Sequence, residues 1–161
     1  MGSPEAATAA ISDANAQARS DLPFSDTADF DATTKGFIAA LDTAVITDDN
    51  GKPVWDCAEF DFLAEDCPPT ANPSLWRQSE LVARHGLYEV TDRICQIRGL
   101  DLSNMTLIEG DTGVIVIDPL ISAETAAAGL ALYREHRGDK PVTAVIYTHS
   151  HIDHFGGVKG V

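Results

Sequence analysis

Basic residues are scarce in this sequence. Its 161 residues include 11 Lys and Arg against 25 Asp and Glu, which leaves a formal net charge of −14 at pH 7. A surface with this charge repels the phosphates of nucleic acids and the anionic headgroups of membranes. We therefore expect no nucleic-acid partner. An anionic substrate would need metal ions or local basic residues to reverse the field at its site.

Long apolar runs are also absent. No stretch approaches the ~18 continuous apolar residues of a membrane span. We therefore expect no membrane-spanning helix. Residues 1–20 are alanine-rich and polar and lack the apolar core of a secretion signal. With no export signal visible, the compartment stays unknown; the cytoplasm is the default expectation, and a periplasmic or secreted location stays open.

Cysteine is rare, with three residues at scattered positions. Cys57, Cys67 and Cys95 lack the close paired spacing of a structural metal site. Cys57 and Cys67 could close a small disulfide loop in an oxidising compartment. Unpaired thiols are the favoured alternative.

What is present suffices for a folded domain, because 44% of the residues are hydrophobic. In the first half, apolar spacing predicts a helix over residues 33–46. A dense turn signal at 47–53 precedes an expected strand that begins at Val54. Residues 57–72, rich in proline and acidic side chains, are expected to be irregular, and a helix is predicted over 74–85.

The second half alternates strand and turn signals. Strands are predicted at 87–90, 94–98, 105–108 and 114–117, with glycines in the last turn supplying positive φ. An alanine-rich helix follows over 122–136, ended by Gly138. Residues 141–147 are expected to form a strand buried on both faces. A right-handed crossover would place the end of strand 114–117 beside the segment that follows Tyr147.

That segment is the most informative part of the chain. His149, His151, Asp153 and His154 lie within six residues, directly after the predicted strand and just before two glycines. Imidazole and carboxylate are the side chains that bind divalent transition metals, and a two-metal site needs several of them close together. The first two histidines would share one ion, and Asp153 with His154 would serve a second. The alternative is a loop of solvated histidines.

Asp118 follows the 114–117 strand and would therefore lie near the histidine loop. It could orient a ligand histidine without touching the metal. An aspartate before a proline is equally typical of a residue that only starts a turn.

Residues 148–157 resemble the His-x-His-x-Asp-His signature of the metallo-β-lactamase fold. Longer stretches resemble more narrowly the alkyl sulfatase branch of that superfamily. The resemblance runs from about Gly51 to the end of the chain, and these stretches are residues 51–56, 72–78, 99–113, 116–120 and 122–125.

The resemblance implies an α+β fold of the αββα metallo-β-lactamase type, represented here only by its first half. We expect an N-terminal tail and early helix at 1–50, an irregular wrapping segment plus helix at 51–85, and the start of the metallo-β-lactamase-like domain at 86–161. The further metal ligands and later domains of the family have no counterpart. We therefore expect an amino-terminal piece of a larger enzyme that is inactive alone and binds metal weakly.

The implied activity is zinc-dependent hydrolysis of alkyl sulfate esters to alcohol and sulfate. By resemblance, His149 and His151 ligate one zinc ion, and Asp153 and His154 ligate the second. Asp153 would also position the metal-bound water that attacks the ester. The implied partners are a small-molecule alkyl sulfate ester and, in the full-length enzyme, a second copy in a homodimer.

Two alternatives remain open. The first is another hydrolase of the same fold, acting on a lactone, thioester or β-lactam, because the metal signature alone does not choose a substrate. The second is a non-enzymatic module that pairs with a second chain, suggested by the unfinished sheet.

Overall fold

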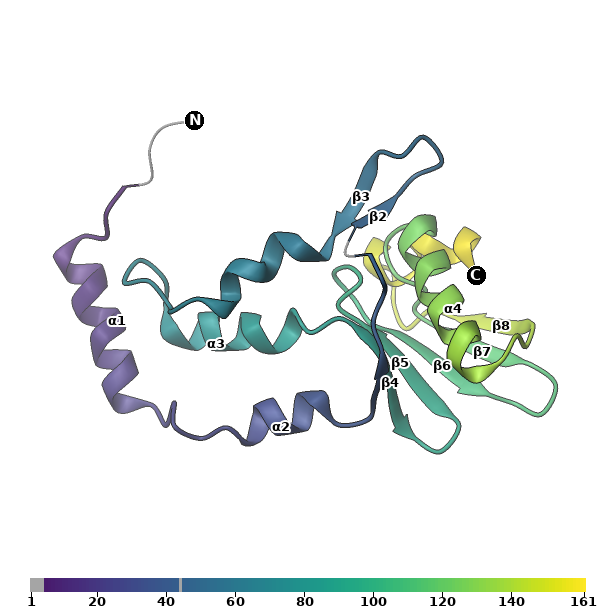
Figure 1. Cartoon of the computed structure of the whole chain (residues 1–161), viewed down its shortest axis with the longest axis horizontal. Helices are drawn as coiled ribbons and strands as arrows, with labels where there is room; N and C mark the ends of the chain where they lie inside the picture. Colours follow the sequence, from purple (N-terminus) through teal and green to yellow (C-terminus); the bar gives the residue numbers. More distant parts are fainter. Residues whose placement is uncertain (1–4, 44) are drawn as a thin grey trace.

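A computed structural model of the chain describes residues 5–43 and 45–161. Its main sheet has six strands in the order β1-β4-β5-β6-β7-β8 (Figure 1). The strands are β1 (Phe37–Ala39), β4 (Gly86–Thr91), β5 (Ile94–Arg98), β6 (Met105–Glu109), β7 (Val114–Ile117) and β8 (Val142–Ile146). The predicted strands of the second half are thus confirmed, with boundaries shifted by a residue or two.

The pair of strands that positions the histidine loop is β7 and β8. All other neighbours in the sheet are antiparallel, whereas β7 and β8 run parallel with Ile117 opposite Ile146. Helix α4 (Ala123–Arg137) connects them, as the sequence predicts. A capping box at Ser122 begins this helix and Gly138 ends it, with φ of 100°.

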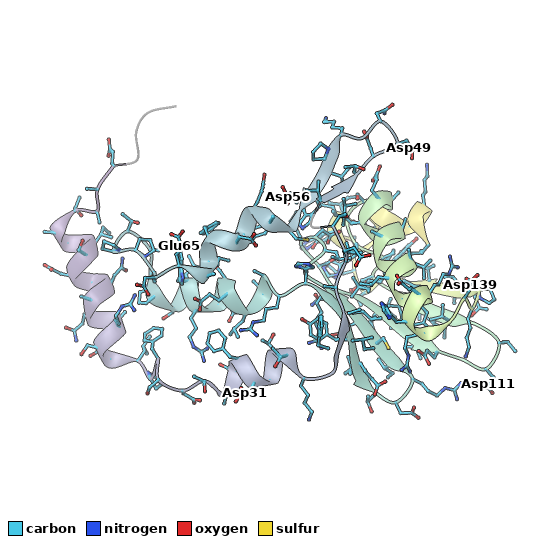
Figure 2. The ribbon with its side chains drawn as sticks, in the orientation of Figure 1. Asp31, Asp49, Asp56, Glu65, Asp111 and Asp139 are labelled. Atoms are coloured by element: carbon cyan, nitrogen blue, oxygen red, sulfur yellow. The ribbon has the colours of Figure 1, made fainter. Side chains whose placement is uncertain are left out.

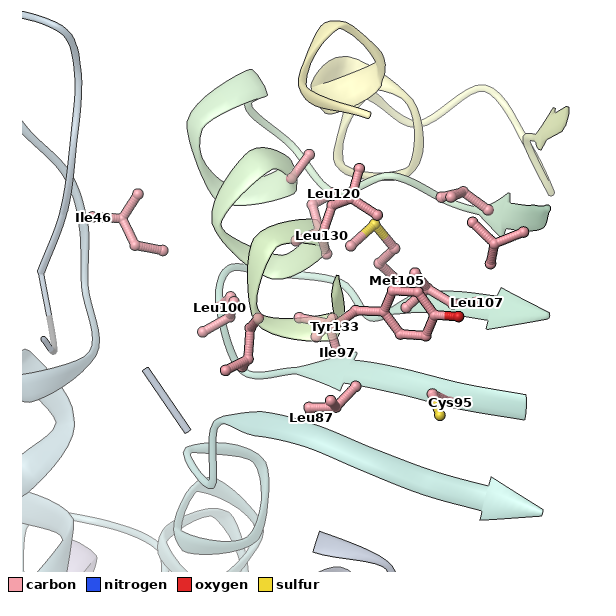
Figure 3. Close-up of a cluster of buried hydrophobic side chains, with 14 of the residues drawn as sticks. Ile46, Leu87, Cys95, Ile97, Leu100, Met105, Leu107, Leu120, Leu130 and Tyr133 are labelled. Atoms are coloured by element: carbon pink, nitrogen blue, oxygen red, sulfur yellow. The ribbon is translucent and has the colours of Figure 1, made fainter. Parts of the chain in front are cut away.

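The core lies between one face of the sheet and α4 (Figure 3). Alternate residues of the central strands point to that face, because successive side chains of a strand lie on opposite sides. Cys95, Leu107 and Val116 form a row across three strands, and each is fully buried. Helix α4 covers the row with Leu130 and Tyr133, which are 3% and 0% exposed.

The prediction that residues 141–147 are buried on both faces is wrong. β8 is the last strand of the sheet in the described part of the chain, and only its β7 side is paired. Ile146 is 48% exposed and Tyr147 is 47% exposed. An apolar run does not distinguish a central strand from an edge strand, because the difference depends on which neighbours pack against it.

The prediction that the glycines of the β6–β7 turn supply positive φ is also wrong, although the turn itself is confirmed. Neither Gly110 nor Gly113 has positive φ. The Gly113 position lacks room for a side chain, since a Cβ there would lie 2.7 Å from the carbonyl oxygen of Pro141. This glycine is required by the close approach of β8, not by the turn.

Besides β1, residues 5–43 and 45–85 contain three α-helices, a separate two-stranded sheet and a 3-10 helix. Figure 1 shows the helices extending to one side of the six-stranded sheet. The elements of this part are α1 (Ala9–Asp21), α2 (Ala28–Thr34), β2 (Val45–Thr47), β3 (Pro53–Asp56), η1 (Cys57–Ala64) and α3 (Pro73–Val82). The predicted turn before Val54 is confirmed, and so is the helix predicted over 74–85, although α3 ends at Val82. The segment 57–72, expected to be irregular, instead begins with the eight residues of η1.

The helix predicted over residues 33–46 is wrong. Helix α2 ends at Thr34, and Phe37–Ala39 instead form β1, paired with the edge of β4. Gly36 makes this change of direction with φ of 75°, and its carbonyl oxygen accepts a hydrogen bond from the N–H of Glu89 at 2.7 Å. Pairing with a sheet edge therefore overrides the helical spacing of the apolar residues.

Several acidic side chains lie at the periphery, spread over the whole molecule. Figure 2 shows Asp31, Asp49, Asp56, Glu65, Asp111 and Asp139 on widely separated elements. Cys57, Cys67 and Cys95 are unpaired, so the disulfide alternative is wrong. No helix in residues 5–43 and 45–161 has the length and apolar character needed to cross a membrane.

Candidate metal centre

The candidate metal centre lies at the adjacent ends of β7 and β8. Because these strands are parallel, Asp118 and Thr148, which follow them, come out at the same edge of the sheet. The N–H of Asp118 donates to the carbonyl oxygen of Ile146 at 3.0 Å and so extends the strand pairing by one residue. The sequence prediction that the end of the 114–117 strand lies beside the histidine loop is confirmed.

Asp118 is a nearly buried acceptor that holds three groups of this loop. Its Oδ1 accepts the N–H of Thr148 at 2.8 Å, and its Oδ2 accepts the Thr148 hydroxyl at 2.6 Å. The same Oδ2 lies 2.8 Å from Nδ1 of His154. Burial acts to raise the pKa of Asp118, but the hydrogen bonds from Thr148 and His154 outweigh burial and lower it. The carboxylate is therefore ionised at neutral pH.

An ionised Asp118 fixes which ring nitrogens carry protons. A carboxylate can only accept, so His154 must donate from Nδ1 and Thr148 must direct its single hydroxyl proton to Asp118. The Thr148 oxygen, 2.9 Å from Nδ1 of His149, then accepts a hydrogen bond from the N–H of that ring. With Nδ1 engaged in this way, Nε2 is the ring nitrogen of each histidine that can bind a metal.

The rings of the loop are gathered close together. The centroid of His149 lies 4.7 Å from that of His151 and 4.1 Å from that of His154. Nε2 of His154 lies 3.3 Å from Oδ2 of Asp153. Two ligands of one tetrahedral zinc ion, each about 2.0 Å from it, are separated by about 3.3 Å. Asp153 and His154 therefore have the spacing of two ligands of the same ion.

Two donors do not complete a site. Among residues 5–43 and 45–161, no three His, Cys, Asp or Glu side chains are placed so that they could hold one ion together. A catalytic zinc ion has three protein ligands. The donor types, and the spacing of Asp153 and His154, fit a divalent transition metal.

Glycines hold the loop against the start of α4. A Cβ at Gly157 would lie 2.5 Å from the carbonyl oxygen of Ser122 and 2.8 Å from the Cβ of Ala126. Gly156 and Gly160 meet the backbone of Ile121 and Ala123 just as closely. The short 3-10 helix η3 (Gly156–Gly160) can lie against α4 because these positions carry no side chain.

Comparison with known proteins agrees with this geometry. The family model of the metallo-beta-lactamase superfamily matches residues 98–161. The linear primary-alkylsulfatase of Pseudomonas sp is 54% identical over 157 residues, which cover 96% of this chain and 23% of that protein. The alkyl/aryl-sulfatase BDS1 of Saccharomyces cerevisiae is 52% identical over 149 residues, covering 92% and 23%.

A solved structure shows the same architecture. The stereoselective inverting sec-alkylsulfatase from Pseudomonas sp. superimposes with a TM-score of 0.91 at 47% identity, over 98% of this chain and 25% of that one. The chain belongs to the alkyl sulfatase branch of the metallo-β-lactamase superfamily. It spans about a quarter of the length of these relatives, with 23% of each of the two curated sequences covered.

The metallo-β-lactamase fold thus explains why the chemistry-bearing residues gather at one sheet edge. The chain's other two histidines do not join them. His136 lies in the last turn of α4, whereas the loop packs against the first turn of that helix, roughly 20 Å away along a helix of this length. His85 lies against Gly99 at the other end of the loop that follows β5.

An apolar groove is connected to the histidine loop through Ser103. Its volume is about 610 Å³, within the range of small-molecule sites. Its walls include Asp101 and Ser103, and the Ser103 hydroxyl donates to the carbonyl oxygen of Asp153 in the histidine loop. Its apolar walls come mainly from β3, η1 and α3, and include Trp55, Phe60, Phe62, Leu75, Trp76 and Val82.

Sequence reasoning missed three residues of this centre, namely Thr148, Asp101 and Ser103. Each acts through hydrogen bonds to segments distant in the sequence, such as that of Ser103 to Asp153. All three lie in stretches that carry the family resemblance, and that was the only signal available for them.

Proposed function

We propose that the chain is part of a zinc-dependent alkyl sulfatase, which hydrolyses alkyl sulfate esters to alcohol and sulfate. The observation that carries this proposal is the set of contacts of Asp118, which engage Nδ1 of His154 directly and Nδ1 of His149 through Thr148, so that Nε2 of each ring is left to bind a metal. The identity of about 50% to alkyl sulfatases supports the substrate class.

The residues divide into two pairs. His149 and His151, whose rings are adjacent, would hold one zinc ion, and Asp153 with His154 would hold the second. Asp153 would also position the attacking water. When bound, a pair of ions supplies activated water at neutral pH and positive charge for the ester oxygens. Asp118 keeps the histidines in the metal-binding form, directly for His154 and through Thr148 for His149.

The groove would receive the alkyl chain. Contact between the alkyl chain and the aromatic and aliphatic walls would remove apolar surface from water and so stabilise binding by about 25 cal/mol per Å². Ser103 belongs both to the groove wall and to the contact with Asp153. An alkyl chain bound in the groove would therefore direct the sulfate end of the substrate toward the histidine loop. We propose that the segment 51–85 serves mainly to build this wall, and that residues 86–161 form the metal-binding unit.

The remaining ligands would come from outside the described residues. Each ion has two donors here, which supports weak metal binding by this chain alone. We also propose, from the family resemblance, that the complete enzyme is a homodimer. Zinc content of the purified 161-residue chain, measured with its circular dichroism, tests the weak metal binding. We expect little bound zinc, and about two tightly held ions per folded chain would contradict it.

The activity is tested in the complete enzyme with dodecyl sulfate, following release of inorganic sulfate. We expect hydrolysis that is lost after chelation and restored by zinc. His151→Ala should abolish it, whereas His136→Ala, on the distant end of α4, should leave it unchanged. A complete, zinc-loaded enzyme that cleaves a lactone or thioester but no alkyl sulfate would overturn the proposal.

The groove is tested by chain length. Val82 lines it and is 61% exposed, so Val82→Asp should raise KM for dodecyl sulfate much more than for hexyl sulfate. Val90→Asp is the matched control, because Val90 is 50% exposed on β4 and is not part of the groove wall. Equal effects of the two variants on both substrates would count against an alkyl chain in this groove.

A further inference from the structure

The loop that joins β5 to β6, residues 99–104, reaches across to the histidine loop. Ser103 in this loop is 8% exposed. Its hydroxyl donates a hydrogen bond to the backbone carbonyl oxygen of Asp153, a residue fifty positions later. This hydrogen bond is the contact by which residues 99–104 hold the backbone of the candidate metal centre.

Ser103 is itself held in place by a buried carboxylate. Oδ1 of Asp101 accepts the N–H of Ser103 at 3.0 Å. Oδ2 of Asp101 accepts the N–H of Ile121 at 3.0 Å and the hydroxyl of Thr125 at 2.7 Å. Asp101 is 7% exposed, and Thr125 is fully buried in the first turn of α4. Asp101 therefore fixes the position of Ser103 relative to the helix that supports the histidine loop.

The short 3-10 helix η2 (Ile152–His154) is consequently held at two points from two directions. Asp118 holds the ring of His154, and Ser103 holds the peptide of Asp153. The side-chain direction of a residue follows from its backbone, so these two contacts set the 3.3 Å separation between Oδ2 of Asp153 and Nε2 of His154.

We propose that Ser103, supported by Asp101, is a positioning residue that aims the Asp153 carboxylate at the ion it shares with His154. This inference rests on the proposed metal-dependent function and adds a residue that does not touch the metal. Removal of the hydroxyl frees the Asp153 peptide to turn, while His149 and His151 keep their arrangement. The effect should therefore fall on one of the two ions.

The test is metal titration of the complete enzyme, stripped by chelation and titrated with zinc against a chromophoric chelator. We expect Ser103→Ala to weaken one of the two binding steps about ten- to hundredfold, the range found for residues that orient metal ligands, and to leave the other step unchanged. Ser103→Thr keeps the hydroxyl and should restore the weakened step. Selective loss with rescue by threonine supports the proposal.

Other outcomes overturn it. Equal weakening of both steps, accompanied by a lower thermal midpoint, would show that Ser103 only stabilises the fold. Unchanged affinities would show that the hydrogen bond to Asp153 has no effect on the ligand. If Ser103→Ala does not fold, Ser103→Cys replaces the hydroxyl by a weak donor at nearly the same volume and is read in the same way.

The titration also separates this proposal from the proposed function. A wild-type enzyme that binds two zinc ions but leaves alkyl sulfates intact would overturn the substrate assignment, and the effect of Ser103→Ala on metal affinity would still be decided. A complete wild-type enzyme that binds no zinc would overturn both.

Discussion

Oδ2 of Asp118 lies 2.8 Å from Nδ1 of His154 and 2.6 Å from the hydroxyl of Thr148, so one carboxylate oxygen orders two neighbouring parts of the histidine loop. Asp118 reaches them from a backbone with φ of 54°, a conformation that costs about 1–2 kcal/mol for a residue with a side chain. The contacts with the loop offset this cost.

Replacement of Asp118 by asparagine tests its role. Asp118→Asn keeps the shape but removes the charge, and the amide can turn its NH₂ group toward Nδ1 of His154. We expect zinc affinity of the complete enzyme to fall about ten- to hundredfold. Asp111→Asn, at an aspartate whose side chain is 90% exposed, is the control and should bind zinc normally. Unchanged affinity in Asp118→Asn would contradict the ordering role.

Gly157 is expected to tolerate no side chain. Gly157→Ala places a methyl group against the backbone of Pro119 and Ser122, and we expect a loss of about 3 kcal/mol, at the upper end of overpacking costs. Gly51→Ala is the control, because nothing lies within 4 Å of a Cβ there and only the φ of 77° is unfavourable, at about 1 kcal/mol. Thermal unfolding midpoints of the two variants should differ clearly, and similar midpoints would contradict the close packing of η3 on α4.

The C-terminal end of α4 is held to the sheet by an ion pair. Nε of Arg137 lies 2.8 Å from Oε1 of Glu109, with side chains 27% and 11% exposed. We expect Arg137→Gln to destabilise the protein by about 2 kcal/mol, the scale of a hydrogen bond between charged groups. Arg93→Gln breaks the exposed pair with Asp111, whose side chains are 48% and 90% exposed, and should cost less than about 1 kcal/mol.

The same pair predicts a pH dependence. The hydrogen bonds from Arg137 lower the pKa of Glu109 below its usual 4.5. A carboxyl whose folded pKa is lowered stabilises the protein above its unfolded pKa, and this contribution is lost as pH falls through the folded value. The stability difference between wild type and Arg137→Gln should therefore be constant above about pH 5 and shrink below pH 4.5. Denaturant unfolding at several pH values checks this, and a constant difference down to pH 3 would contradict it.

Tyr133 carries a buried hydroxyl near the Glu109 carboxylate. The ring projects from α4 and is fully buried in the core, and the hydroxyl makes no hydrogen bond of good geometry among the described residues. Burial and the negative charge of Glu109 raise the pKa of Tyr133 to about 12. We expect Tyr133→Phe to leave stability unchanged or raise it by up to about 1 kcal/mol, since it removes an unpaired buried polar group.

Tyr88 provides the matched control for this change. Its hydroxyl donates to the carbonyl oxygen of Arg84 at 3.3 Å, so Tyr88→Phe should cost about 0.5–1 kcal/mol. Chemical denaturation of both variants gives the comparison. A larger loss in Tyr133→Phe than in Tyr88→Phe would show that the Tyr133 hydroxyl has a partner after all.

The sequence alone determined the elements that depend on local signals. Helix α4 begins at a capping serine and ends at a glycine, and the strands from β4 to β7 have turn residues at their ends. The dense group of His149, His151, Asp153 and His154 pointed to metal binding without any structure. These features are readable because the residues that cause them lie within a few positions of each other.

The tertiary structure decided whatever depends on distant segments. The sequence left Asp118 as either a turn residue or an orienting residue, and the parallel pairing of β7 with β8 places it against His154. The helix predicted over residues 33–46 became β1 because the edge of β4 was free to pair with it. The link from Asp101 through Ser103 to Asp153 spans some fifty residues of chain and has no local pattern. Hydrogen bonds of this kind depend on where the fold brings two segments together, and residue spacing carries no record of them.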